Sequence, residues 1–380
     1  MAWKARLKFW ALNMRISILL HSNIRAGSSL VMFRGANALA HAGHAVEIVF
    51  EERLFPKAID FFQLAPGITT RFVDEAAPWP LSDITIFSWW QTAYTVCRVP
   101  ARAAVLYLLG DAKPLYGSPA LDLYIDLAYR EPGLRYLHLN TDNLREELAE
   151  SPHPSILVQA GVDYARFAAA APLLPPPLGD GLRVLVEGPP NAPHKRVEES
   201  IAALAGLPGV EIVHCSASGI APADTRARAM GDVPECNLPG LFASCDLIAK
   251  LSAHETFALP VLECFAAGGT AITTAFQGHA DYIRHEENGI VVPLDDPWAA
   301  ARAALIRLRD DRKLLARLRQ EARRTAASLD WGRFDQRFVG ALEGIADRAG
   351  DGPANTPLLD RYAASMRAAV HLWALAQAGK

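Results

Sequence analysis

Two carboxylates, Glu255 and Glu263, stand eight residues apart around the start of a predicted helix. Pro260 suits the first helical turn, where no amide hydrogen bond is required, and Gly268 suits the left-handed residue that ends a helix. The helix would therefore begin with free amide donors, the groups that bind a diphosphate: those of Thr256, Phe257, Ala258 and Leu259. An anionic nucleotide sugar lying here would have hydroxyls within reach of both carboxylates. A purely structural interpretation also exists, because acids near the positive end of a helix stabilise it by a few tenths of a kcal/mol.

The stretches around these residues alternate between short apolar strands and helical patterns, which is typical of α/β domains with parallel sheets. Residues 14–170 would form a first domain that opens with a strand, a helix and a second strand between Arg15 and Phe50. Residues 171–181, rich in Pro and without a periodic pattern, are the predicted linker. Residues 182–348 repeat the alternation and carry both carboxylates, and residues 349–380 contain a last amphipathic helix.

Length and composition narrow the function classes. The chain has 380 residues and 51% hydrophobic residues, enough for two domains with substantial cores. A formal net charge of -3 gives no basic field, so nucleic acid is not an expected partner. The five cysteines form no Cys-x-x-Cys pair and indicate reduced thiols in a cytoplasmic protein.

Membrane contact would be peripheral at most, because no apolar run is long enough to span a bilayer. In residues 1–13, Trp3, Leu7 and Trp10 recur at helical spacing between basic residues. This pattern fits a basic helix touching the inner membrane from the cytoplasmic face. The alternative, which we favour, is a loose N-terminal tail.

The spacing of Glu255 and Glu263 resembles the Glu-x7-Glu motif of retaining family-4 glycosyltransferases, the group 1 glycosyl transferases of the GT-B fold. The resemblance runs from about residue 14 to 328 and is most specific between Asp246 and Pro293. It implies two Rossmann-like parallel-sheet domains facing across a cleft, with the C-terminal helix returning to the first domain. The implied activity is transfer of a sugar from a nucleotide-diphosphate sugar to a glycan or lipid-linked acceptor.

The resemblance also implies roles for residues of the second domain. Glu255 would hold hydroxyls of the donor sugar and Glu263 those of the ribose. Lys195 stands where the family places a lysine on the donor diphosphate, and the amides from Thr256 to Leu259 would bind the same group. The family's arginine is replaced by Pro189, so Arg196 is the candidate to substitute for it.

Two loops depart further from the family pattern. Gly27 fits the second glycine of a Gly-Gly loop that faces the donor diphosphate, but Ala26 replaces the first. Asp281 stands where the family has a glutamate near the donor. These departures, with Pro189, keep open a catalytically decayed protein that binds a nucleotide sugar; a GT-B epimerase or phosphorylase is a further alternative.

An aromatic run in the first domain offers a place for the acceptor. Trp89 and Trp90 follow a buried strand. Asp111 follows the next strand and matches an acidic position of the family, so the resemblance makes it a candidate catalytic residue beside Glu255 and Lys195. The run is similar to rhamnosyltransferases of bacterial surface-glycan synthesis, which favours a deoxythymidine diphosphate sugar as donor. Both tryptophans could equally be core residues.

No cofactor is expected. The Gly-x-Gly-x-x-Gly fingerprint of dinucleotide binding is absent from residues 20–37. Neither an Asp-x-Asp pair nor a histidine cluster offers ligands at metal spacing, so we expect transfer without a metal.

Overall fold

The computed structural model describes residues 13–23, 26–52, 62–73, 79, 81–96, 99–131, 136–148, 151, 154–177, 179–346 and 357–378. The predicted membrane contact of the N-terminal tail lies almost wholly outside them. The chain divides into two compact units: unit 1 comprises residues 1–159 and 334–380, and unit 2 comprises residues 160–333.

Unit 1 is built on a parallel sheet of seven strands in the order β3-β2-β1-β4-β5-β6-β7. The strands are β1 (Arg15–Ser22), β2 (Ala45–Glu52), β3 (Thr69–Phe72), β4 (Ser82–Phe87), β5 (Ala101–Leu108), β6 (Tyr136–Leu139) and β7 (Ser155–Leu157). Strand β1 pairs with β2 from Arg15 beside Ala45 and with β4 from Ile16 beside Ile84, so it lies inside the sheet next to the central strand β4.

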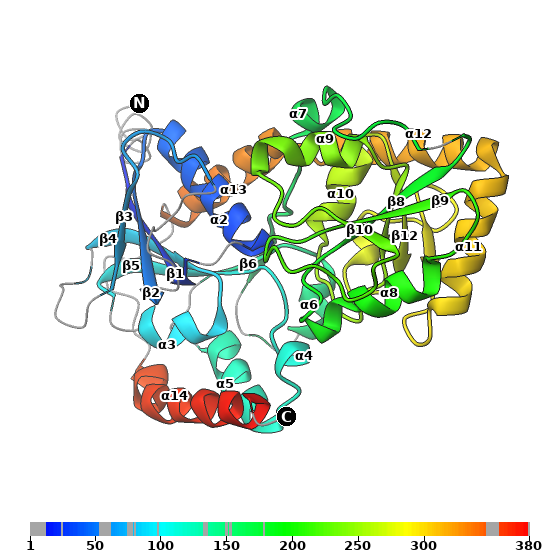
Figure 1. Ribbon diagram of the computed structural model, residues 1–380. Coiled ribbons are helices and arrows are strands. Elements are labelled where there is room, and N and C mark those ends of the chain that lie inside the picture. The colour runs from blue at the N-terminus through cyan, green and yellow to red at the C-terminus, as the bar shows by residue number, and fades with distance from the viewer. Residues whose placement is uncertain are drawn as a thin grey trace. The chain divides into compact units, whose positions relative to one another are not determined.

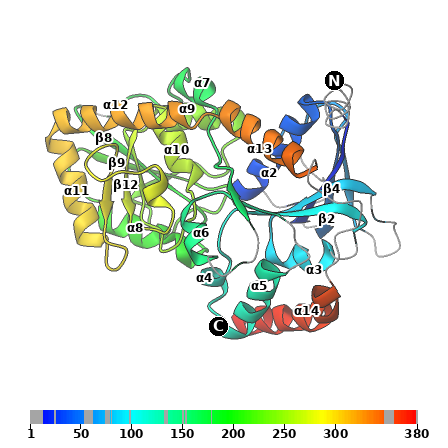
Figure 2. The same ribbon diagram turned by 180° about the vertical axis from the view of Figure 1, so that it is seen from behind.

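Helices cover both faces of this sheet (Figures 1 and 2). Helices α2 (Gly27–His41) and α13 (Trp331–Ala346) lie on one face; α3 (Ala93–Val96), α5 (Pro119–Arg130) and α14 (Pro357–Ala378) lie on the other. The short helices η1 (Trp90–Thr92), α4 (Lys113–Tyr116) and α6 (Asn143–Glu147) follow strands β4, β5 and β6. Leu359, Ala363 and Met366 of α14 are buried in the same core as Ile125 of α5.

Unit 2 is built on a parallel sheet of six strands in the order β10-β9-β8-β11-β12-β13. The strands are β8 (Leu182–Glu187), β9 (Val210–Cys215), β10 (Ala227–Ala229), β11 (Leu247–Lys250), β12 (Thr270–Thr274) and β13 (Ile290–Val292). The helices are α7 (Tyr164–Ala168), η2 (Pro193–Lys195), α8 (Val197–Leu204), η3 (Glu235–Asn237), α9 (Leu238–Ala243), α10 (Leu259–Ala266), η4 (His279–Asp281), α11 (Trp298–Asp310) and α12 (Arg312–Ser328).

The division into units differs from the predicted boundaries at the linker. Residues from the predicted linker are bound to unit 2: the Leu173 amide donates to the Gly240 carbonyl at 2.8 Å, and the Leu174 amide to Ser244 Oγ at 2.9 Å. Arg183 donates to the Pro175 carbonyl at 2.7 Å. The segment is thus part of a folded unit, because its backbone is held by side chains and carbonyls distant in sequence.

Helix α13 also differs from its predicted place in the second domain. From Phe334 onward it belongs to unit 1, where Phe338 is fully buried. The ring of Phe338 lies 5.7 Å from that of Tyr107, and a Cβ added to Gly35 would lie 2.6 Å from Phe338 Cε1. Arg34 and Asp335 form an ion pair beside this contact. Glycine at position 35 therefore permits the close approach of α2 and α13.

Candidate functional site

The centre of the candidate site is formed where two neighbouring parallel strands of unit 2 end. Strand β8 pairs with β11 through Val184 beside Leu247, and their carboxyl ends carry Glu187 and Lys250. Lys250 Nζ donates to Glu187 Oε2 at 2.6 Å and to the Glu187 carbonyl at 2.9 Å. Lys250 is 2% exposed, so this ammonium group is held inside the protein by its partners.

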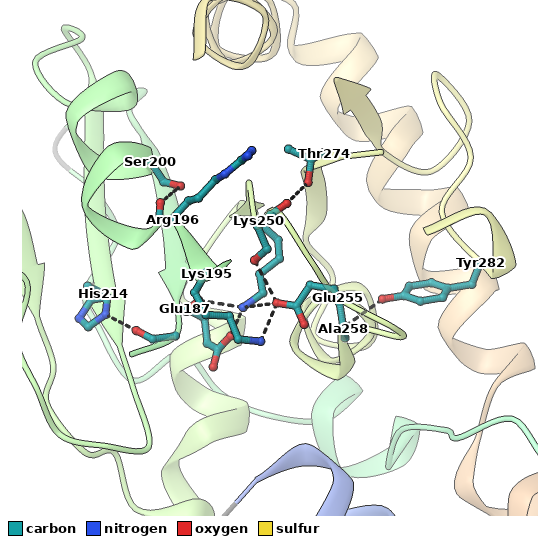
Figure 3. A network of polar contacts seen from close by, with 12 residues as sticks. Glu187, Lys195, Arg196, Ser200, His214, Lys250, Glu255, Ala258, Thr274 and Tyr282 are labelled. Atoms are coloured by element: carbon teal, nitrogen blue, oxygen red, sulfur yellow. Dashed lines mark hydrogen bonds and ion pairs between the residues drawn. The ribbon is translucent and has the colours of Figure 1, made fainter. Parts of the chain in front are cut away.

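Glu255 lies in the loop between β11 and α10, and its hydrogen bonds and ion pairs with the described residues all fall on one of its two carboxylate oxygens. Glu255 Oε1 accepts from Lys195 Nζ at 2.8 Å, from Ser252 Oγ at 3.0 Å, and lies 3.2 Å from Lys250 Nζ. Figure 3 shows the two lysines converging on this oxygen while Oε2 points away from them. Among the described residues none donates to Oε2, which remains an open acceptor.

The pKa values follow from this arrangement. Burial would raise the pKa of Glu255, but the nearby ammonium groups of Lys250 and Lys195 outweigh it and lower the pKa to about 2. Burial would lower the pKa of Lys250, but the carboxylates of Glu187 and Glu255 outweigh that effect and raise it above its ordinary value. Glu255 and Lys250 are therefore both ionised at neutral pH.

The start of α10 lies directly after Glu255. Its N-cap residue is Ala258, in the left-handed region with φ 51°, and Pro260 stands in the first turn. The Ala258 carbonyl accepts from Tyr282 Oη at 2.8 Å and from the Val261 amide at 2.9 Å. Within the described part of the chain, no protein group accepts a hydrogen bond from four successive amides, those of Thr256, Phe257, Ala258 and Leu259. A cluster of free donors thus adjoins an open carboxylate oxygen.

Glu263 lies on α10 and differs in charge from Glu255. Burial, together with the nearby carboxylates of Glu187 and Glu235, raises its pKa to about 8, against a smaller lowering by Arg166. Its side chain keeps part of its surface accessible. The two carboxyls of the motif therefore differ in charge at neutral pH. Glu255 is ionised and held by two lysines, whereas Glu263 is mostly protonated.

The loop before α8 places its two basic residues in opposite directions. Lys195 ends η2 and reaches Glu255, and the Ala253 amide donates to the His194 carbonyl at 2.8 Å, which ties the two loops together. Arg196, with φ 50°, donates instead to the Leu294 carbonyl at 2.9 Å and lies 5.8 Å from the Trp298 ring centroid. Lys195, but not Arg196, is brought to the carboxylate (Figure 3).

Glycine suits position 188 because of its backbone conformation and not because of a lack of space. It has φ +132°, and an added Cβ would lie 3.5 Å from Lys195 Cβ and 3.6 Å from Lys250 Nζ. His214 Nε2 is 2.9 Å from the Gly188 carbonyl and holds the turn from below. Pro189 follows, where a side-chain donor was expected. Asp281 ends η4, one residue before the Tyr282 whose hydroxyl contacts the α10 start.

The remaining predicted residues belong to unit 1. Gly27 is the first residue of α2, and its N-cap Ala26 is extended and provides no side-chain cap. Trp90 is 1% exposed and belongs to the core, whereas Trp89 is partly exposed and donates to Gln91 Oε1 at 2.6 Å. Asp111 Oδ1 accepts from the Lys113 amide at 3.1 Å in the loop after β5. Of the two tryptophans, Trp89 is the one with surface available to an acceptor.

Sequence reasoning missed Glu187, Lys250 and Ser252 as parts of the site. A signal existed: Lys250 is a charged residue inside an otherwise apolar strand, and Glu187 precedes a glycine at a strand end. Their contact depends on the pairing of β8 with β11, which a local sequence pattern does not contain.

The described residues offer neither a metal-binding cluster nor a helix suited to span a membrane. They contain no group of three or more His, Cys, Asp or Glu side chains arranged to hold a metal ion. Within the same ranges, none of the helices combines the length and apolarity needed to cross a membrane.

Comparison with known proteins agrees with the fold. Residues 224–325 match the family described as "Glycosyl transferases group 1", and this matched segment includes Glu255 and Glu263. The sucrose-phosphate synthase of Thermosynechococcus elongatus superposes with a TM-score of 0.72 at 16% identity, over 88% of this chain and 100% of that one. The Anabaena protein HepE, solved with UDP and glucose, superposes with a TM-score of 0.68 at 15% identity, over 87% and 100%. The predicted GT-B fold, with two parallel-sheet α/β domains, is thereby confirmed.

A curated relative gives a narrower match. The D-inositol 3-phosphate glycosyltransferase of Salinispora arenicola is 36% identical over 123 residues, which is 32% of this chain. The chain spans about a quarter, 27%, of the length of that relative. Its name differs from the rhamnosyltransferase subgroup indicated by the aromatic run, so that finer assignment stays a prediction.

Proposed function

We propose that this protein is a retaining glycosyltransferase that moves a sugar from a nucleotide-diphosphate sugar to a glycan or glycolipid acceptor. The observation that carries the proposal is the Glu255 carboxylate, clamped on Oε1 and open on Oε2, beside the free amides of Thr256 to Leu259. A clamped carboxylate orients a sugar hydroxyl, and free amides at a helix start bind an anion. The matched family domain spans both features.

In the proposed reaction, the bond between the anomeric carbon and the diphosphate oxygen breaks, and a bond from the acceptor oxygen to that carbon forms on the same face. The leaving phosphate takes the acceptor's proton, so the products are the glycosylated acceptor and a nucleoside diphosphate. Lys195 and the α10 amides would stabilise the charge that develops on the diphosphate. Glu255 would hold the donor sugar and Glu263, in its neutral form, the ribose. No metal is assigned a step, and transfer should persist when divalent cations are chelated.

Donor and acceptor classes follow from weaker signals. The aromatic run favours a deoxythymidine diphosphate sugar, whereas HepE was solved with UDP and glucose. A surface glycan or lipid-linked acceptor would meet unit 1 near Trp89 and Asp111, at the cytoplasmic face of the inner membrane. The name of the Salinispora arenicola relative adds a phosphorylated inositol as an acceptor to test.

One observation favours a binding protein as the second candidate. Pro189 provides no donor, and Arg196, its expected substitute, is engaged with Leu294 and Trp298. A protein with this arrangement would bind a nucleotide sugar and turn it over slowly or not at all. Turnover measurements separate the two candidates.

The experiment measures nucleoside diphosphate release from UDP-, GDP- and dTDP-sugars, with and without acceptors. Glu255→Ala and Lys195→Ala should each lower release from the accepted donor by about tenfold or more, which corresponds to roughly 1.4 kcal/mol of barrier. Lys313→Ala and Glu321→Ala, on the surface helix α12, are matched controls and should leave the rate unchanged. Binding without release would support the second candidate, and neither binding nor release would refute both.

A further inference from the structure

Two lysines neutralise Glu255, and they differ in access to solvent. The side chain of Lys195 is 23% exposed, whereas that of Lys250 is 2% exposed. Both ammonium groups face the same oxygen, at 2.8 Å and 3.2 Å. Only Lys195 combines this contact with a position from which it can turn toward a ligand.

The proposed transfer reaction requires Lys195 to exchange one anionic partner for another. In the free protein it neutralises Glu255, and in the proposed complex it binds the diphosphate. If Lys195 were the sole partner, its departure would leave a buried carboxylate without a counter-charge, which strongly destabilises a protein interior. Lys250 remains in place because Glu187 holds it through both a carboxylate oxygen and the main-chain carbonyl.

We propose that Lys250, anchored by Glu187, is a positioning residue that keeps Glu255 charged and oriented when Lys195 moves to the donor diphosphate. The Ser252 hydroxyl also donates a hydrogen bond to Glu255 Oε1. Glu255 Oε2 then faces the sugar throughout the reaction. Lys250 itself touches no substrate. This inference rests on the proposed function and assigns a role to a residue that the family motif does not include.

The inference predicts a selective effect on the sugar part of the donor. Because Lys250 acts through Glu255, its loss should weaken binding of a nucleotide sugar much more than binding of the matching nucleoside diphosphate. Lys195→Met should show the opposite pattern and weaken both ligands alike, since both contain the diphosphate. Glu255→Gln should resemble the Lys250 variants.

The test compares dissociation constants by calorimetry for three pairs: UDP with UDP-glucose, GDP with GDP-mannose, and dTDP with dTDP-glucose. The pair that the wild type binds is then measured with Lys250→Met and with the double variant Lys250→Met/Glu187→Gln. The double variant removes one positive and one negative charge, so the net charge of the cluster is unchanged. In both, the constant for the nucleotide sugar should rise about tenfold or more, and that for the nucleoside diphosphate by less than about threefold.

A second ion pair of the same sheet, between a buried arginine and a partly exposed glutamate, supplies the matched control. Arg183 is 2% exposed and bonds Glu211 Oε2 at 2.8 Å, at the opposite end of β8 from Glu187. Arg183→Met/Glu211→Gln makes the same exchange away from the site and should leave both constants unchanged.

The possible results distinguish failure of the role of Lys250 from failure of the proposed function. Equal weakening of both ligands by the Lys250 variants, or the same selective loss in the Arg183 control, would overturn the role of Lys250 while the proposed function stands. If Lys250→Met does not fold, the charge-matched double variant decides. Absence of binding to all three pairs by the wild type would overturn the proposed function and this inference together.

Discussion

Replacing Glu255 by glutamine should make unit 2 less stable in a way that depends on pH. The pKa of this carboxyl falls from 4.5 to about 2 in the folded protein, because the ammonium groups of Lys250 and Lys195 outweigh burial. A group whose pKa is lowered on folding adds stability above its unfolded pKa, and loses it as the pH falls toward the folded one. The size of this contribution at pH 7 is about 3 kcal/mol, falling to about 1 kcal/mol at pH 3.

The assay is urea unfolding followed by circular dichroism at several values between pH 7 and pH 3. The difference in unfolding free energy between wild type and Glu255→Gln should shrink across this range, because the carboxyl becomes protonated in the unfolded wild type while it stays mostly ionised in the folded protein. Glu199→Gln, at an exposed position of α8, is the control and should differ from wild type by less than about 0.5 kcal/mol. A difference for Glu255→Gln that stayed constant from pH 7 to pH 3 would refute the reasoning, since it would show that the two lysines do not set the ionisation of Glu255.

Three further perturbations test other parts of the structure. In urea unfolding, Glu263→Gln should be more stable than wild type at pH 9 but not at pH 5. The folded-state pKa of about 8 means that the wild type loses stability as the pH rises from 4.5 through 8, because the buried carboxyl must then ionise. Partial solvent access of this side chain reduces the size of the loss. Gly268→Ala should lower the melting temperature, with a cost of about 1–3 kcal/mol, because φ is +95° and the new Cβ would meet Arg323 Nη2 at 2.9 Å; an unchanged melting temperature would contradict the left-handed helix end. Gly35→Ala should cost about 1–3 kcal/mol by forcing the ring of Phe338 to move, and combining it with Phe338→Ala should give a sub-additive loss if α2 and α13 pack as described.

Local sequence signals predicted the elements of both sheets well where the pattern was strong. The apolar runs at β1, β8, β9 and β12 appear as strands, and Pro260 and Gly268 mark the two ends of α10. These features depend on neighbouring residues: proline needs no amide partner in a first turn, and glycine tolerates a positive φ. They are readable without knowing the rest of the fold.

The boundaries between the units were harder to predict. Nothing local distinguishes α13 from the preceding helices, yet its packing is decided by the missing Cβ of Gly35, three hundred residues earlier. Residues 171–177 contain no periodic pattern, yet carbonyls and hydroxyls of α9 and its end hold their backbone. Both cases depend on contacts between segments far apart in the chain, which a local pattern does not contain.

Local sequence patterns predicted two parallel-sheet domains, which the structure confirms, and a helix start flanked by Glu255 and Glu263. The tertiary structure decided how these groups are charged and aimed. Glu255 and Glu263 are the same residue type, but two lysines lower the pKa of the first, whereas burial and neighbouring carboxylates raise that of the second. The adjacency of β8 and β11 brings Lys250 and Glu187 together from positions 63 residues apart. The charge state of a buried group depends on such spatial neighbours, and for that reason the motif could be found in the sequence while its electrostatics could not.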